Sequence, residues 1–240
     1  MPTIHVQRMS DKALLSEKEL QKLIEWAQKG QAAEIEVTEI TATAALPEMT
    51  YQAFLEWLDE DTHAEWVNGK VVLMSPVSLE HQQIGGFLLT LIRYFVDANQ
   101  LGVVSYEPFQ MKTGPDLPGR SPDILFVANE NLSRLTPTYL DGPADLVVEI
   151  ISPSDRGRDR GEKFYEYETG GIREYWLIDP QRKQAEFYGL DTNGVYRLAN
   201  LGEDRIYHSK VLDGLWLNVG WLWQAQLPPL PTVLREWGLV

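Results

Sequence analysis

Two carboxylates in strand-like stretches are the residues best suited to chemistry. Glu149 interrupts the apolar run from Leu146 to Ile151, and Asp123 heads another apolar run, Ile124 to Val127. Strand alternation places Glu149 on an otherwise apolar face, where a buried carboxylate is costly unless it is paired or binds a metal. If the two runs are neighbouring strands, both carboxylates converge at one edge of a sheet. Carboxylate oxygens suit Mg²⁺ or Mn²⁺ far better than zinc.

A basic cluster follows the strand that carries Glu149. Lys163 lies in a helix predicted from about Arg158 to Glu168, close to Arg156 and Arg160. A short loop would fold this helix back, so that Lys163 faces the end of the strand. A lysine in that position can orient a metal-bound water or stabilise charge at a phosphate.

Each of these residues also has a purely structural interpretation. Glu149 could form a buried ion pair with an arginine or lysine, and Asp123 could cap a turn after Pro122. The basic residues could form a solvated helix face. His81 fits a helix-cap or surface position better than a metal ligand. With four histidines and no cysteine in the chain, a histidine-based or thiolate zinc site is not expected.

The composition is that of a folded, acidic protein. The chain has 240 residues and is 44% hydrophobic, which is enough for a core. The N-terminal stretch lacks the apolar segment of a signal peptide, and no apolar run approaches a membrane span, so we expect a cytoplasmic protein. The net charge of −14 disfavours a protein that coats nucleic acid electrostatically, although it is compatible with a local basic groove.

The elements that must position these residues mix helices, hairpins and strands. Periodicity and turn signals predict the following: helices over Thr50–Leu58 and Ser78–Asn99, hairpins over Glu65–Met74 and Glu186–Leu198, and strands over Val103–Tyr106, Pro108–Lys112, Ile124–Val127, Leu146–Ile151 and Glu174–Ile178. This order predicts an α/β fold with a mixed central β-sheet flanked by helices. Neither G-x-G-x-x-G nor a Walker A sequence is present, which argues against nucleotide cofactors.

The two ends of the chain differ from its centre. Ser16 to Glu19 matches the capping-box pattern, which predicts a helix that ends at Gly30. We therefore predict an N-terminal helical extension and linker over residues 1–46, and one main domain over residues 47–240. The tail contains Trp216, Trp221 and Trp223, which we interpret as a hydrophobic cap or an oligomer contact.

Four short motifs occur together in the chain. They are Pro122-Asp123, Glu149-Ile-Ile-Ser-Pro-Ser154, Asp159-Arg160 with Lys163, and Tyr175-Trp-Leu-Ile-Asp-Pro180. In this combination the chain resembles the PD-(D/E)XK nuclease superfamily, and more closely a large bacterial family assigned as restriction endonucleases. The resemblance covers about residues 50 to 225, and includes the hairpin Glu65–Met74 and the helix led by His81.

The resemblance implies a restriction-endonuclease-like fold and a metal-dependent endonuclease that hydrolyses DNA phosphodiester bonds. Asp123, Glu149 and the backbone carbonyl of Ile150 would hold Mg²⁺, or Mn²⁺, and Lys163 would assist the attacking water. In the superfamily the lysine stands two residues after the acidic residue, a position that Ile151 occupies here. The resemblance also implies a homodimer.

Two weaker candidates, Glu65 and His81, would support the metal-binding residues from nearby positions.

Two other functions remain open. One is a non-catalytic binding or assembly module on the same fold, which the net charge of −14, the tryptophan-rich tail and the N-terminal helix favour. The other is a glycoside hydrolase, with Glu149 and Asp123 as acid and base. The basic cluster near Lys163 suits phosphate better than a sugar.

Overall fold

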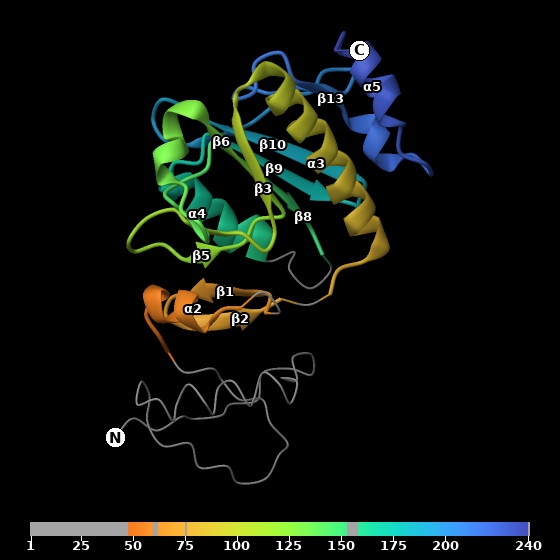
Figure 1. The fold of residues 1–240 in the computed structure, drawn as a ribbon. Coiled ribbons are helices and arrows are strands. Elements are labelled where there is room, and N and C mark those ends of the chain that lie inside the picture. Colours follow the sequence, from red (N-terminus) through yellow and green to blue (C-terminus); the bar gives the residue numbers. More distant parts are fainter. Residues whose placement is uncertain (1–47, 60–61, 75, 153–157, 240) are drawn as a thin grey trace, which may run out of the picture. The chain divides into compact units, whose positions relative to one another are not determined.

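A computed structural model describes residues 48–59, 62–74, 76–152 and 158–239 (Figure 1). The chain divides into two compact units, one ending at Ser75 and the other beginning at Pro76. The helix and linker predicted over residues 1–46 lie outside the described residues. The predicted domain boundaries therefore stay predictions.

The first unit contains a short helix and a hairpin. Its elements are α2 (Tyr51–Trp57), β1 (Ala64–Val67) and β2 (Lys70–Leu73). The side-chain oxygen of Thr50 accepts a hydrogen bond from the Ala53 N–H at 3.1 Å and so begins the helix. Asn68 and Gly69 turn the hairpin with φ values of 51° and 86°, the left-handed conformation that this dipeptide favours. The helix and the hairpin predicted for this region are confirmed.

A mixed six-stranded sheet organises the second unit, in the order β11-β10-β9-β8-β6-β3. The strands are β3 (Gly102–Tyr106), β6 (Ile124–Ala128), β8 (Leu146–Ile150), β9 (Glu174–Asp179), β10 (Gln184–Leu190) and β11 (Tyr196–Leu198). Strand β8 lies in the middle, antiparallel to β6 and parallel to β9. The predicted mixed sheet is confirmed, and both faces of its central strand are buried.

Helices cover the two faces of this sheet. Helix α3 (Leu79–Asn99) packs on one face and α4 (Lys163–Gly170) on the other (Figure 1). Alternate residues along β8 separate accordingly. Val148 joins the core that contains Leu88 of α3, whereas Val147 joins the core that contains Tyr167 of α4. A side chain on the Val147 face, such as Glu149, therefore points toward α4.

Both helices begin near the same edge of the sheet. Ser78 caps α3 by accepting a hydrogen bond from the His81 N–H at 3.2 Å. Helix α4 continues a π-helical turn, Arg158–Glu162. The predicted helix over 158–168 is thus confirmed, with an irregular first turn.

The remaining elements complete the second unit. They are the ribbon strands β4 (Gln110–Lys112), β5 (Gly119–Arg120) and β7 (Tyr139–Asp141), a 3-10 helix (Asn129–Arg134), the hairpin β12 (Ile206–His208) and β13 (Trp216–Asn218), a second 3-10 helix (Val219–Trp223), and α5 (Leu230–Glu236). Trp221 and Val233 of this tail are buried in the same core as α3, so the tail caps that core. No helix among the described residues is both long and apolar enough to cross a membrane.

Candidate active site

The strand register brings Asp123 and Glu149 to neighbouring positions. Ile124 lies opposite Val148 in the antiparallel pair β6–β8, so the next residues outward are Asp123 and Glu149. The Asp123 carboxylate accepts a hydrogen bond from the Ile150 N–H at 2.6 Å. Asp123 is therefore bonded to the end of strand β8, 27 residues later in the chain, and the register brings Asp123 and Glu149 to the same edge of the sheet.

Glu149 is buried and bonded to helix α4. Its Oε1 accepts hydrogen bonds from Lys163 Nζ at 2.9 Å and from the Tyr167 hydroxyl at 2.7 Å. The side chains of Glu149 and Lys163 are only 5% and 3% exposed. The buried ion pair considered for Glu149 is present, and its partner is the predicted lysine. The solvated-face interpretation of Lys163 is wrong, because α4 turns this side chain inward.

Tyr167 is a site residue that the motifs in the sequence do not single out. It follows Lys163 by four residues, so both side chains project from the same face of α4. This spacing is the signal that could have predicted a shared contact with Glu149.

A buried arginine holds α4 in place. Arg120 donates two hydrogen bonds to the Glu166 carboxylate, from Nε and Nη2, both at 2.8 Å. A second acid, Glu162, lies 3.6 Å from the same guanidinium. Such a forked pair fixes both distance and orientation. Because Arg120 shortly precedes Asp123, the pair couples the two sides of the candidate site.

His81 is brought into contact with Asp123. Its Nε2 lies 3.4 Å from Asp123 Oδ2, and the residue is 6% exposed. The surface interpretation of its side chain is wrong, because the residue is buried. Only the backbone N–H of His81 takes part in the helix cap. Burial would lower the pKa of His81, but the bond to Asp123, the charges of Asp123 and Glu107, and the Ile150 backbone together raise it.

Two more carboxylates, Asp179 and Glu186, lie on the next two strands, β9 and β10. Arg160 forms an ion pair with Glu186 of β10 and lies 3.6 Å from Asp179 at the end of β9. Burial opposes the charge of Arg160, yet these carboxylates raise its pKa. The Tyr188 hydroxyl donates to Glu186, and burial together with this carboxylate raises the pKa of Tyr188. Arg156 and residues 153–154 of the second motif lie outside the described residues.

The donor set at the sheet edge fits a magnesium ion better than other metals. Mg²⁺ is usually held by one or two carboxylates and completes its shell with water. Asp123, Glu149 and the Ile150 carbonyl are such a set of hard oxygen donors. Among the residues that the structure describes, no group of three or more His, Asp or Glu side chains is arranged to hold a metal. A metal site built from side chains alone is therefore not found in this part of the chain.

Other buried carboxylates have structural roles. Glu174 accepts five hydrogen bonds, from Trp176 Nε1, the Tyr207 and Ser209 hydroxyls, and the N–H groups of Lys210 and Val211. A glutamate in a buried strand is thus no proof of function in itself. The other weak candidate, Glu65, lies in β1 of the first unit.

Comparisons with known proteins show the family and the fold of this chain. A family model described as "Uma2: Putative restriction endonuclease" matches residues 51–220. Uncharacterized protein slr1290 of Synechocystis sp. is 24% identical over 166 residues, which span 66% of this chain and 83% of that protein.

A crystal structure of a putative nuclease belonging to DUF820 from Anabaena variabilis has the same fold. Its TM-score is 0.60 at 18% identity, and the match covers 73% of this chain and 97% of that one. The predicted restriction-endonuclease-like fold is confirmed by this likeness. The family match covers well over half of the sequence and confirms the resemblance expected from the four motifs. The chain belongs to the Uma2 family of putative restriction endonucleases.

Proposed function

We propose that this protein is a metal-dependent endonuclease that hydrolyses DNA phosphodiester bonds. Asp123, Glu149 and the carbonyl of Ile150 are the proposed ligands of Mg²⁺, or Mn²⁺. When bound there, the metal would polarise the scissile phosphate and lower the pKa of a bound water. Lys163 is the proposed partner of that water.

The contact between Lys163 and Glu149 is the observation that best supports this proposal. The 2.9 Å bond holds a lysine next to a proposed metal ligand although the classical position, two residues after the acid, is Ile151. The ammonium group lies where it can orient a water or stabilise negative charge on a phosphate. Tyr167 binds the same oxygen and so restricts the orientation of the Glu149 carboxylate.

Asp123 and the basic groups have complementary parts in this proposal. The hydrogen bond from the Ile150 N–H orients Asp123 toward the end of β8. Lys163 and Arg160 are each paired with carboxylates, so in this proposal a bound metal supplies the net local positive charge on a chain whose net charge is −14. Local positive charge of this kind is needed for a phosphate to approach an acidic protein.

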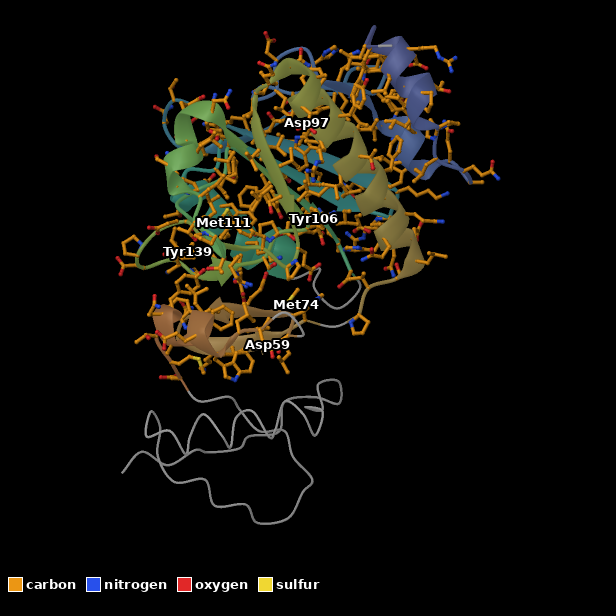
Figure 2. All side chains as sticks on the ribbon, in the orientation of Figure 1. Asp59, Met74, Asp97, Tyr106, Met111 and Tyr139 are labelled. Atoms are coloured by element: carbon orange, nitrogen blue, oxygen red, sulfur yellow. The ribbon has the colours of Figure 1, made fainter. Side chains whose placement is uncertain are left out.

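A nicking assay with metal-ligand variants tests the proposal. Supercoiled plasmid, linear duplex and single-stranded DNA are incubated with Mg²⁺ or Mn²⁺ and with the wild type, Asp123→Asn or Glu149→Gln. We expect the wild type to cleave and each variant to lose about 100-fold or more of the rate. A suitable control is Asp97→Asn, because Asp97 lies at the far end of α3 with a side chain that is 66% exposed (Figure 2).

Two results would contradict the proposal. One is cleavage that survives both substitutions, since a contaminating nuclease would then explain it. The other is a wild type that binds DNA or another macromolecule but cleaves none of the three substrates with either metal. That second result would favour the binding or assembly module.

The active form that we propose is a cytoplasmic homodimer. Nucleases that cut both strands of a duplex commonly use two copies of one site, and closed pairs are the commonest oligomers. The absence of cysteine from the sequence suits a reducing compartment. Light scattering on the purified chain measures its mass directly, and a monomer at all concentrations that support cleavage would contradict the dimer.

A further inference from the structure

A pocket of about 610 Å³ opens beside the first turns of α3, the helix that carries His81, and has no part in the proposed chemistry. It lies between the first turns of α3, the turn after β9 and the segment that follows the 3-10 helix Val219–Trp223. A volume of this size is typical of sites for small molecules or single nucleotides.

Two residues that line the pocket stand next in the chain to residues that contact the acidic residues at the sheet edge. On α3, Glu80 lines the pocket, and the next residue, His81, contacts Asp123. After β9, Lys183 lines the pocket, and its neighbour Arg182 donates its N–H to Asp179 Oδ1 at 3.0 Å. A strand of DNA with one phosphate at Asp123 could therefore place an adjacent nucleotide in the pocket.

The lining is rich in amides and nearly neutral. Gln83, Gln224 and Gln226 each offer one acceptor and two donor hydrogens, and all three are exposed. The opposite charges of Glu80 and Lys183 cancel. A neutral, amide-lined pocket is poorly suited to a free phosphate, whereas amide side chains match the mixed donors and acceptors on the edge of a nucleobase.

The pocket also holds an aromatic ring with an unused donor. Trp223 lines it, and the indole Nε1 is buried without a hydrogen-bond partner among the described residues. Packing alone therefore orients this ring. The ring is partly exposed where it lines the pocket, and stacking of bases on aromatic rings is a common source of affinity for single strands.

We propose that this pocket binds one unpaired nucleobase of the DNA strand whose phosphate lies at the Asp123–Glu149 edge. The inference rests on the proposed nuclease function, and it gives that function a preference for single-stranded, flipped or bulged nucleotides near the cut. Base recognition comes from Gln83, Gln224 and Gln226, with Trp223 as the stacking surface.

The test uses a short single-stranded oligonucleotide with one 2-aminopurine, and a matched oligonucleotide in which that position is abasic. Binding to the full-length protein is followed by anisotropy and by 2-aminopurine quenching, in EDTA so that metal-dependent cleavage cannot occur. The triple variant Gln83→Ala, Gln224→Ala, Gln226→Ala is compared with the wild type and with Gln52→Ala, an exposed glutamine outside the pocket. Trp223→Phe, which keeps a ring but removes the N–H, is measured in parallel.

We expect the triple variant to bind the base-containing oligonucleotide about tenfold more weakly and the abasic one unchanged. Gln52→Ala should bind like the wild type. Equal affinity of the wild type for the two oligonucleotides, equal affinity of the triple variant and the wild type, or no binding at all would overturn the proposal. Binding of a disaccharide by the protein, without binding of either oligonucleotide, would also overturn the proposal.

The same variants separate this inference from the proposed nuclease function. Suppose that Asp123→Asn loses plasmid nicking, whereas the triple variant keeps both nicking and oligonucleotide binding. That result would contradict the base pocket and leave the nuclease function supported. Base-dependent binding without any nicking by the wild type would sink the nuclease alone.

Discussion

Two buried glutamates on adjacent strands have different partners, and we propose a metal-binding role for Glu149 only. Glu174 of β9 is fully buried and receives five hydrogen bonds, four of which tie the segment Tyr207–Val211 to the sheet. Glu174→Gln would turn an NH₂ group toward donors and leave several of them unsatisfied. We expect it to lower the free energy of unfolding by about 3 kcal/mol, measured by urea denaturation with tryptophan fluorescence.

A metal-binding measurement tests the proposed difference between Glu174 and Glu149. Folded Glu174→Gln should retain Mn²⁺ binding, whereas Glu149→Gln should lose it. An unchanged urea midpoint for Glu174→Gln would show that its hydrogen bonds do not hold the 207–211 segment.

Lys163 can be tested apart from the proposed ligands. Lys163→Gln removes the ammonium group but keeps a polar side chain beside Glu149, to which Lys163 is bonded at 2.9 Å. We expect DNA cleavage to fall about 100-fold while Mn²⁺ binding persists, because a group that assists the water acts in the reaction and not in holding the metal. If Lys163→Gln lowers the free energy of unfolding but leaves the cleavage rate per folded molecule unchanged, the Lys163–Glu149 contact is only a structural ion pair.

At the scale of the element, helix α3 contains two adjacent glycines with different surroundings. A Cβ on Gly86 would meet nothing within 4 Å, whereas one on Gly85 would lie 3.2 Å from Ile150 Cδ1. Gly86→Ala should therefore stabilise the protein by about 0.5 to 1 kcal/mol through helix propensity. Thermal unfolding of the two single variants measures the difference.

Gly85→Ala is the matched comparison, and we expect it to stabilise less or to destabilise. Its methyl group would press on the residue whose carbonyl is a proposed metal ligand, so cleavage should fall in this variant and not in Gly86→Ala. Equal stabilisation by the two alanines would show that α3 and the end of β8 can separate at little cost.

At the scale of the whole molecule, buried tyrosines predict how stability depends on pH. Burial and then nearby carboxylates raise the pKa of Tyr196 and Tyr207 above the ordinary value of 10.0. Above pH 10 the unfolded chain releases these protons while the folded chain keeps them, so the free energy of unfolding falls as the pH rises. The slope is about 1.4 kcal/mol per pH unit for each tyrosine.

Urea denaturation between pH 9 and pH 12 measures this slope, with Tyr196→Phe as the comparison. The variant loses a hydrogen bond to the Ile172 carbonyl and should be less stable near pH 9. Its stability should then decline less steeply than that of the wild type. Parallel curves would mean that Tyr196 ionises normally in the folded protein.

Much of the second unit follows from local patterns in the sequence. The apolar stripe predicts α3 to within one residue at its start, and the buried runs predict β6, β8 and β9. Strand β7 and helix α5 were not predicted, because short elements carry little periodicity and depend on the core that they cover. The extension over residues 1–46 and the domain boundary remain predictions.

The sequence by itself determined which residue types were available, namely two carboxylates in buried strands, a lysine on the next helix and the motifs of one family. Only the tertiary structure decided that Asp123 and Glu149 are neighbours, that Tyr167 and His81 join them, and that Glu174 serves the core instead. The physical reason is that spacing along the chain sets the face on which a side chain lies within one element. Which faces then meet depends on strand register and on packing between elements distant in sequence.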